Sequence, residues 1–253
     1  MKIVRYKDGP LIKWGVIEEG MIREMEGDPF GHFHLSPKAK KLEEVKLIAP
    51  CLPSKIVALG LNYRDHAEEV KMAIPEQPLL FMKPSTSVIG PGDAIVYPKM
   101  SRRVDYEAEL AVVIGKIAKS VPAERAGDYI LGYTCLNDVT ARDLQPKDGQ
   151  WTLAKGFDTF APMGPWIVTD VDPHQLEIAT YLNGERRQHS NTKNLIFSPH
   201  QLVSFISHVM TLLPGDVIAT GTPSGIGRMV VGDKVDVVIE GIGTLTNTVI
   251  AGE

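Results

Sequence analysis

The sequence has few cysteines and no long apolar run. Cys51 and Cys135 are the only cysteines among 253 residues, which excludes a disulfide scaffold and a four-cysteine zinc site. The apolar runs are far shorter than the roughly 20 residues of a membrane-spanning helix. The charged N-terminus is not followed by the apolar segment of a secretory signal. We therefore expect a cytoplasmic protein with no membrane partner.

An excess of one charge is also missing. The chain carries 27 basic and 31 acidic side chains, with a formal net charge of -4. This mixed charge offers no broad basic surface for nucleic acid. Hydrophobic residues make up 43% of the chain, which is enough for a core, and the length suits one large domain with a small appendage. We expect a small-molecule ligand.

Short strands dominate the predicted secondary structure. Residues 3–6, 11–17 and 21–24 are predicted to form short strands joined by turns, followed by a short helix near residues 38–45. Pro50 and Pro53 place a boundary between a small N-terminal β-rich domain, residues 1–50, and a larger domain, residues 51–253. Within the larger domain, residues 105–114 are the longest strand candidate. The main helix candidates are residues 63–72 and 199–213. The sequence predicts a mainly β, α+β fold.

Acidic residues alternate along the strand candidate. Asp105, Glu107 and Glu109 share one face, because side chains alternate across a strand. Neighbouring glutamates on one face repel each other unless they are solvated, protonated or bridged by a cation. An exposed strand face is one interpretation. The apolar run at residues 110–114 favours the other, a metal site at the end of a buried strand.

A third metal ligand would have to come from another element. Asp138 follows the apolar strand candidate 130–136, where a strand delivers a side chain to the edge of a sheet. Taken alone, Asp138 fits a turn-capping residue as well. Three carboxylates without nitrogen or sulfur ligands would select magnesium or manganese, with calcium as a further option, and would disfavour zinc.

His66 and Glu69 lie one turn apart if residues 63–72 are helical. A carboxylate beside an imidazole fixes its tautomer and raises its basicity, as in a general base. A surface pair has the same spacing, and such pairs are common and weak. The residues alone leave both interpretations open.

Six motifs follow one another along the chain. They are Gly60-Leu61-Asn62-Tyr63-Arg64-Asp65-His66, Phe81-Met82-Lys83-Pro84-Ser85, Glu107-Ala108-Glu109-Leu110, Asn137-Asp138-Val139-Thr140-Ala141-Arg142-Asp143, Trp151-Thr152-Leu153-Ala154-Lys155 and Thr220-Gly221-Thr222-Pro223. In this order and spacing they closely resemble the fumarylacetoacetate hydrolase family over about residues 55–250. The resemblance implies a mixed β-sandwich roll and a homodimer.

The resemblance also implies roles for individual residues. Its metal ligands, for magnesium or manganese, would be Glu107, Glu109 and Asp138. Its catalytic residues would be the dyad His66 and Glu69, on a segment that orders as a lid, together with Lys155. The residues expected to hold substrate oxygens are Arg142, Gln145, Gly221 and Thr222. Asp105 matches no ligand of the family.

The resemblance implies a divalent-metal-dependent enzyme acting on a small 2-oxo acid or its enol. Hydrolysis of the C–C bond of an acylpyruvate is the reaction expected first. The alternatives share the same enolate: decarboxylation or isomerisation of a 2-hydroxyhepta-2,4-diene-1,7-dioate, and decarboxylation or tautomerisation of oxaloacetate. A sugar-acid dehydratase or hydrolase and a non-catalytic metal-stabilised binding protein are further hypotheses. The presence of His66, Glu69 and Lys155 favours an enzyme over the binding protein.

Overall fold

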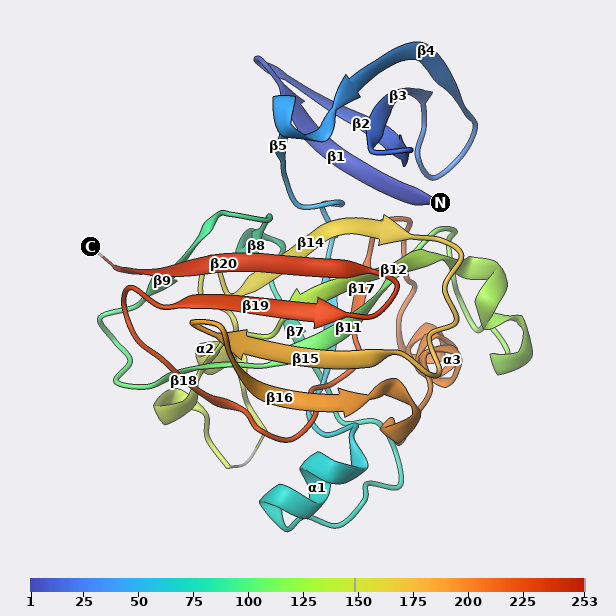
Figure 1. Cartoon of the computed structure of the whole chain (residues 1–253). Helices are drawn as coiled ribbons and strands as arrows, with labels where there is room; N and C mark the ends of the chain where they lie inside the picture. Colours follow the sequence, from blue (N-terminus) through green and yellow to red (C-terminus); the bar gives the residue numbers. More distant parts are fainter. Residues whose placement is uncertain (148, 253) are drawn as a thin grey trace.

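The computed structural model describes residues 1–147 and 149–252, which form a mainly β structure with three short α-helices (Figure 1). The N-terminal strands are β1 (Lys2–Asp8), β2 (Leu11–Glu18), β3 (Met21–Gly27), β4 (Phe33–Lys41) and β5 (Lys46–Leu47). The remaining strands are β6 (Ile56–Leu59), β7 (Leu80–Lys83), β8 (Val88–Ile89), β9 (Ala94–Tyr97), β10 (Val104–Tyr106), β11 (Ala108–Ile114), β12 (Ile130–Asn137), β13 (Thr140–Ala141), β14 (Ala161–Val168), β15 (Glu177–Leu182), β16 (Glu185–Asn191), β17 (Val217–Ala219), β18 (Gly227–Met229), β19 (Lys234–Ile239) and β20 (Gly243–Ala251).

The helices are α1 (Arg64–Val70), α2 (Thr152–Lys155) and α3 (Pro199–Val209). Five 3-10 turns complete the described elements: η1 (Leu42–Glu44), η2 (Ser85–Ser87), η3 (Ala123–Tyr129), η4 (Arg142–Leu144) and η5 (Thr192–Asn194). Across the described parts of the chain, no helix has both the length and the apolar character needed to cross a bilayer.

Two mixed sheets face each other across the main core. The longer sheet has the order β4-β3-β2-β1-β14-β12-β11-β17-β6-β7, and the second has the order β16-β15-β19-β20-β9. Most neighbours are antiparallel, but β17 pairs with β6 and β20 pairs with β9 in parallel. The second sheet lies in front of β11 and β12 in Figure 1, and β11 contacts β15 and β19. The predicted mainly β, mixed sandwich fold is confirmed.

Strand β11 is buried on both faces. Leu110 and Val112 belong to the core shared with α3 and the second sheet. Ala111 and Val113 belong to a second apolar cluster on the other side of the long sheet. Polar side chains at the start of this strand are therefore carried into the interior of the protein, as the apolar run at residues 110–114 predicted.

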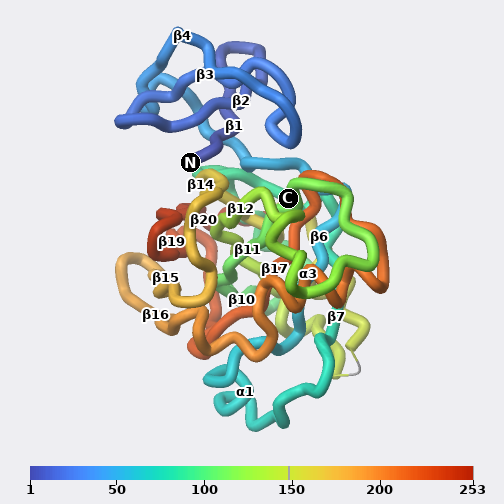
Figure 2. The backbone as a smooth tube through the Cα atoms, turned by 90° about the vertical axis from the view of Figure 1, so that its right-hand side faces the viewer, coloured from blue at the N-terminus to red at the C-terminus, as the bar shows by residue number. Residues whose placement is uncertain are grey.

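The N-terminal strands form a unit at the opposite end of the molecule from α1, as Figures 1 and 2 both show. β1 joins this unit to β14, with Lys2 opposite Val168 and Ile3 opposite Ile167. The predicted domain boundary at residue 50 lies between β5 and β6. The N-terminal unit is therefore remote from the helix that carries His66.

Three secondary-structure predictions were wrong. The helix expected near residues 38–45 is the end of β4 followed by η1; Pro37 and the lysines of β4 suit an edge strand better than a helix. The helix expected to reach residue 213 ends at Val209, because Met210 is extended. β16 was not predicted, because this edge strand is almost entirely polar.

The strand expected over residues 105–114 is broken at Glu107. β10 ends at Tyr106 and pairs with β13 and β18, whereas β11 begins at Ala108 and pairs with β12 and β17. Side chains replace the sheet ladder at the break. The N–H of Glu107 donates to Asn137 Oδ1 at 2.9 Å, and the N–H of Ala108 donates to Gln188 Oε1 at 3.0 Å.

Away from this break, Asp216 ties the beginning of β17 to the segment that precedes β6. Its side chain is fully buried and accepts hydrogen bonds from the backbone N–H groups of Ser54, Lys55 and Leu213. The Lys55 ammonium lies 2.5 Å from Asp216 Oδ2. Burial alone would raise the pKa of Asp216, but the hydrogen bonds from Lys55, Leu213 and Ser54 outweigh it and lower that pKa.

We expect Asp216→Asn to lower the free energy of unfolding at pH 7 by about 3 kcal/mol, because it leaves Lys55 unpaired and places an amide donor against N–H groups. The folded-state pKa of Asp216 is below its unfolded value, so the carboxylate stabilises the fold at neutral pH. This stabilisation is lost as the pH falls below about 4. Urea denaturation at pH 7 and pH 3.5 measures both effects. Asp128→Asn, in an exposed pair with Arg125, is the control and should leave the free energy of unfolding nearly unchanged at both pH values.

Candidate active site

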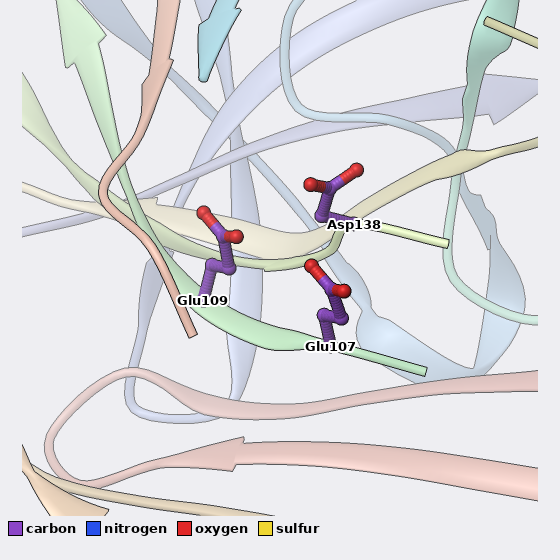
Figure 3. Close-up of side chains that lie close together, drawn as sticks. All are labelled: Glu107, Glu109 and Asp138. Carbon is purple, nitrogen blue, oxygen red and sulfur yellow. The ribbon is translucent and has the colours of Figure 1, made fainter. Parts of the chain in front are cut away.

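Three carboxylates converge where β11 begins and β12 ends. Glu107 occupies the break before β11, Glu109 is the second residue of β11, and Asp138 follows β12 directly. Because β11 and β12 pair antiparallel with Glu109 opposite Leu136, these positions meet at one edge. Each residue offers an oxygen within 4.8 Å of the others, and Figure 3 shows the three side chains close together. Their exposures are 6%, 0% and 0%.

Three basic side chains surround the carboxylates. Lys155 Nζ, on α2, lies 2.8 Å from Glu107 Oε2 and 2.6 Å from Asp138 Oδ2. Lys83 Nζ, at the end of β7, lies 2.5 Å from Asp138 Oδ1 and 3.1 Å from the carbonyl oxygen of Val139. Arg142 donates to Glu107 Oε1. Glu107 and Asp138 are therefore each held by two cationic groups.

The two glutamates differ in their electrostatic surroundings. Burial opposes ionisation of Glu107, but Lys155 and Arg142 together lower its pKa to about 2. Burial, reinforced by the charges of Asp138 and Glu107, raises the pKa of Glu109 well above its usual value. Burial also opposes the charge on Lys155, yet Asp138 and Glu107 raise its pKa overall. Of the three carboxylates, Glu109 is the one with no ion pair to any residue that the structure describes.

The residues fit a hard divalent cation. Glu109 Oε2 accepts from the N–H of Gly221 at 2.7 Å, whereas the buried Oε1 has no hydrogen-bond partner within residues 1–147 and 149–252. A buried, unpaired carboxylate oxygen is costly unless a cation or a water satisfies it. Carboxylate oxygens alone match the preferences of magnesium and manganese.

His66 and Glu69 are hydrogen-bonded on α1, with His66 Nδ1 and Glu69 Oε2 2.8 Å apart. Glu69 Oε1 accepts from the N–H of Gly225 at 3.0 Å, so both carboxylate oxygens are held. Because Glu69 accepts from Nδ1, Nε2 is the ring nitrogen left to accept a proton. His66 is 8% exposed. This geometry matches the arrangement of a general base and its orienting carboxylate.

The segment before α1 packs against the carboxylate site. Asn62 Nδ2 donates to the carbonyl oxygen of Thr220 at 2.7 Å. Gly221 has a φ of +97°, and a Cβ on it would lie 2.8 Å from the Cβ of Asn62. Gly221 also donates its N–H to Glu109. Gly221 therefore lies between Glu109 and the chain that leads into α1. Only glycine fits at this position, because a side chain would collide with Asn62.

Of the residues predicted to hold substrate oxygens, Arg142 and Thr222 are hydrogen-bonded to other side chains of the protein. Arg142 donates to Asp105 Oδ2 at 2.9 Å and to Gln145 Oε1 at 2.6 Å, in addition to Glu107. Thr222 follows Gly221, and its Oγ1 accepts from Gln188. Asp105 is buried between Arg103 and Arg142 and is not part of the carboxylate cluster.

A family model described as fumarylacetoacetate (FAA) hydrolase C-terminal matches residues 55–250. The chain belongs to the fumarylacetoacetate hydrolase family. This confirms the resemblance inferred from the six motifs. A second model, described as Rv2993c-like, N-terminal, matches residues 1–50, the segment that contains β1 to β5.

Relatives within the fumarylacetoacetate hydrolase family are enzymes of several kinds. The structure of a 5-carboxymethyl-2-hydroxymuconate delta-isomerase from Mycobacterium smegmatis is 47% identical, covers 100% of both chains and has a TM-score of 0.94. The mitochondrial oxaloacetate tautomerase Fahd2a of Rattus norvegicus is 42% identical over 219 residues, 82% of this chain and 70% of the rat protein. A maleylpyruvate hydrolase from Sphingobium sp. SYK-6, in complex with manganese(II) and pyruvate, is 32% identical with a TM-score of 0.83 over 100% of both chains. The chain is an enzyme of this family.

Sequence reasoning missed Lys83 and Gln188 in this fumarylacetoacetate hydrolase family member. Lys83 was noted only as part of a motif. A lysine that directly follows a short apolar run is itself a signal, because the run carries it toward the core and buried lysines are almost always paired. Its side chain is 1% exposed. Gln188 lies on the unpredicted strand β16, where nothing in the local pattern distinguishes it from exposed neighbours.

Proposed function

We propose that this chain is a divalent-metal-dependent enzyme that interconverts the keto and enol forms of small 2-oxo acids, as an isomerase or tautomerase. The observation that carries the proposal is the buried cluster of Glu107, Glu109 and Asp138, in which one oxygen of Glu109 is unpaired. The relatives at 42% and 47% identity are a tautomerase and an isomerase, which supports keto–enol chemistry as the first candidate, ahead of hydrolysis. Family membership also supports, as part of the proposal, magnesium or manganese, a homodimer and a cytoplasmic location.

Glu107, Glu109 and Asp138 would hold the ion, whose chemistry when bound is Lewis-acid polarisation of the 2-oxo group. Lys155 contacts Glu107 and Asp138 and is buried, so its charge acts with little screening by solvent. We assign to Lys155 the stabilisation of negative charge that develops on the 2-oxygen. Arg142, Gln145, Gly221 and Thr222 are assigned to the substrate oxygens. His66 Nε2 would accept the proton that leaves C3.

Hydrolysis of an acylpyruvate is the second candidate, and the His66–Glu69 hydrogen bond favours it. An imidazole oriented by a carboxylate can take a proton from water, so that the hydroxyl oxygen attacks the 4-acyl carbonyl and the C3–C4 bond breaks. The hydrolase relative at 32% identity supports this reaction within the same fold. Loss of carbon dioxide from oxaloacetate or from a C3 carboxylate uses the same C3 charge and is the third outcome.

A substrate panel separates these reactions. We expect protein supplied with magnesium or manganese to accelerate ketonisation of the oxaloacetate enol by at least about 100-fold over solution, because a positioned acid or base alone contributes that much. The same preparation treated with a chelator is the control and should be inactive. Spectrophotometry follows the enol, and chromatography follows cleavage of acetylpyruvate and loss of carbon dioxide.

The results rank the candidates directly. Faster cleavage of acetylpyruvate than ketonisation of oxaloacetate would reverse the order of the first two candidates. Metal-independent rates on every member of the panel, or no turnover of any, would contradict the proposal.

A further inference from the structure

Gln188 is a fully buried amide on β16 with every hydrogen-bonding group in use. Its Oε1 accepts from the N–H of Ala108 at 3.0 Å and from Thr180 Oγ1 at 2.6 Å. Its Nε2 donates to Thr222 Oγ1 at 2.9 Å and to the carbonyl oxygen of Pro223 at 2.8 Å. Because a backbone N–H only donates and a carbonyl only accepts, Ala108 and Pro223 fix which end of the amide is oxygen.

Three of these four contacts, those with Ala108, Thr222 and Pro223, join two elements of the candidate site. Ala108 stands between Glu107 and Glu109 at the break that precedes β11. Thr222 and Pro223 follow Gly221, whose N–H holds Glu109 Oε2. One side chain therefore bridges the segment that carries Glu107 and Glu109 and the turn at residues 221–223. β16 is an edge strand of the second sheet and carries none of the other candidate site residues. Gln188 therefore contacts the site from a neighbouring sheet.

The contact with Thr222 determines the direction of its hydroxyl. The amide nitrogen of Gln188 can only donate, so Thr222 Oγ1 is the acceptor in this hydrogen bond. The single proton of that hydroxyl must then point away from Gln188. Thr222 is 5% exposed and follows Gly221, whose N–H holds Glu109, so its hydroxyl lies near the carboxylate cluster and away from bulk solvent.

We propose that Gln188 is a positioning residue that makes Thr222 a hydrogen-bond donor toward the carboxylate of the substrate. The assignment rests on the proposed function, because it requires a 2-oxo acid beside the carboxylate cluster. Gln188 itself contacts no substrate in this arrangement. The proton of Thr222 requires an acceptor on the ligand, so ligands with a carboxylate oxygen there are favoured over those with a group that can only donate, such as an ammonium.

Binding of oxalate, a planar dianion that resembles the enolate of a 2-oxo acid, tests the assignment. Titration calorimetry with manganese-loaded protein should show oxalate binding weakened about 10- to 100-fold in both Thr222→Val and Gln188→Met. Thr222→Val removes the hydroxyl that donates to oxalate, and Gln188→Met frees that hydroxyl to turn away from oxalate. The double variant should be no weaker than the weaker single variant, since both changes remove the same interaction. Manganese affinity, titrated first, should change less than threefold in Thr222→Val.

Two further variants separate positioning from general destabilisation. Asn247→Leu removes another buried amide, which donates to the carbonyl oxygens of Gly90 and Asp93 at 2.9 and 2.8 Å. It should lower the melting temperature without changing the affinity for oxalate. Gln188→Asn keeps a buried amide but is one methylene too short to reach Thr222, so it should fold even if Gln188→Met does not, and should also bind oxalate more weakly.

The outcomes separate a failure of the role proposed for Gln188 from a failure of the proposed function. Wild-type affinity for oxalate in a folded Gln188 variant, or additive losses in the double variant, would overturn the role of Gln188 alone. Absence of oxalate binding by the wild-type protein in the presence of manganese would overturn the proposed function, and this assignment with it.

Discussion

Replacing Glu107, Glu109 or Asp138 by alanine, one at a time, should abolish turnover of every 2-oxo acid that the wild-type enzyme accepts. Each change removes one of the three proposed protein ligands, and the loss of Glu107 or Asp138 also leaves Lys155 without one of its partners. Removing a single metal ligand removes both the anchoring of substrate and the polarisation of its 2-oxo group. We expect a loss of at least about 1,000-fold in kcat/KM, which exceeds the loss expected from removing one electrostatic group alone. Steady-state assays at saturating metal measure it.

Asp105→Asn is the matched control for these three variants. Asp105 is fully buried and lies two residues from Glu107, but it pairs with Arg103 and Arg142 and is outside the cluster. We expect Asp105→Asn to retain metal-dependent turnover. Its kcat/KM should fall moderately, because the change weakens the hydrogen bond that holds Arg142. Equal inactivation of all four variants would mean that burial of charge, and not metal ligation, explains the loss.

His66→Ala should lower kcat by about 10²- to 10⁴-fold, the contribution typical of positioned proton transfer. The fold and the affinity for metal should remain, because His66 contacts Glu69 and not the carboxylate cluster. Steady-state kinetics on oxaloacetate and on acetylpyruvate measure the loss for proton transfer and for water activation separately. A loss on acetylpyruvate alone would assign His66 to hydrolysis and not to keto–enol chemistry.

Glu69→Gln tests whether the two residues act together. It keeps the size of the side chain but removes the charge that orients the imidazole, so it should act in the same direction as His66→Ala. If the pair works as a unit, the double variant should lose little more than the worse single variant. An unimportant helix pair would instead change stability by no more than about 1 kcal/mol and leave kcat intact. Wild-type turnover on both substrates in His66→Ala would exclude the dyad.

The sequence predicted the parts of the site that follow from local periodicity. Alternation placed Glu107 and Glu109 on one face, and the apolar run after them indicated that the strand enters the core. The spacing of His66 and Glu69 required only that the segment be helical, which it is over Arg64–Val70. These features depend on residues within a few positions of each other, so a single segment contains the information.

Other parts of the site depend on contacts between distant segments. The break at Glu107 exists because Asn137 and Gln188, which lie 30 and 81 residues further along the chain, supply acceptors in place of a neighbouring strand. Lys83 contacts Asp138 across 55 residues of sequence. Periodicity carries no information on such pairs, and the polar pattern of β16 hid even the strand that holds Gln188.

Metal binding by the wild-type protein and by its variants tests whether Glu107, Glu109 and Asp138 form a metal site. Chelator-treated protein is titrated with manganese by calorimetry, and a melting curve is recorded with and without the ion. The account predicts one ion per chain and a rise in melting temperature, since an ion at 100 times its dissociation constant stabilises the fold by about 2.7 kcal/mol. It predicts neither effect in Glu107→Ala, Glu109→Ala or Asp138→Ala, and both in Asp105→Asn. Undiminished binding in any of the three alanine variants would remove that residue from the site, and absence of binding by the wild-type protein would contradict the account.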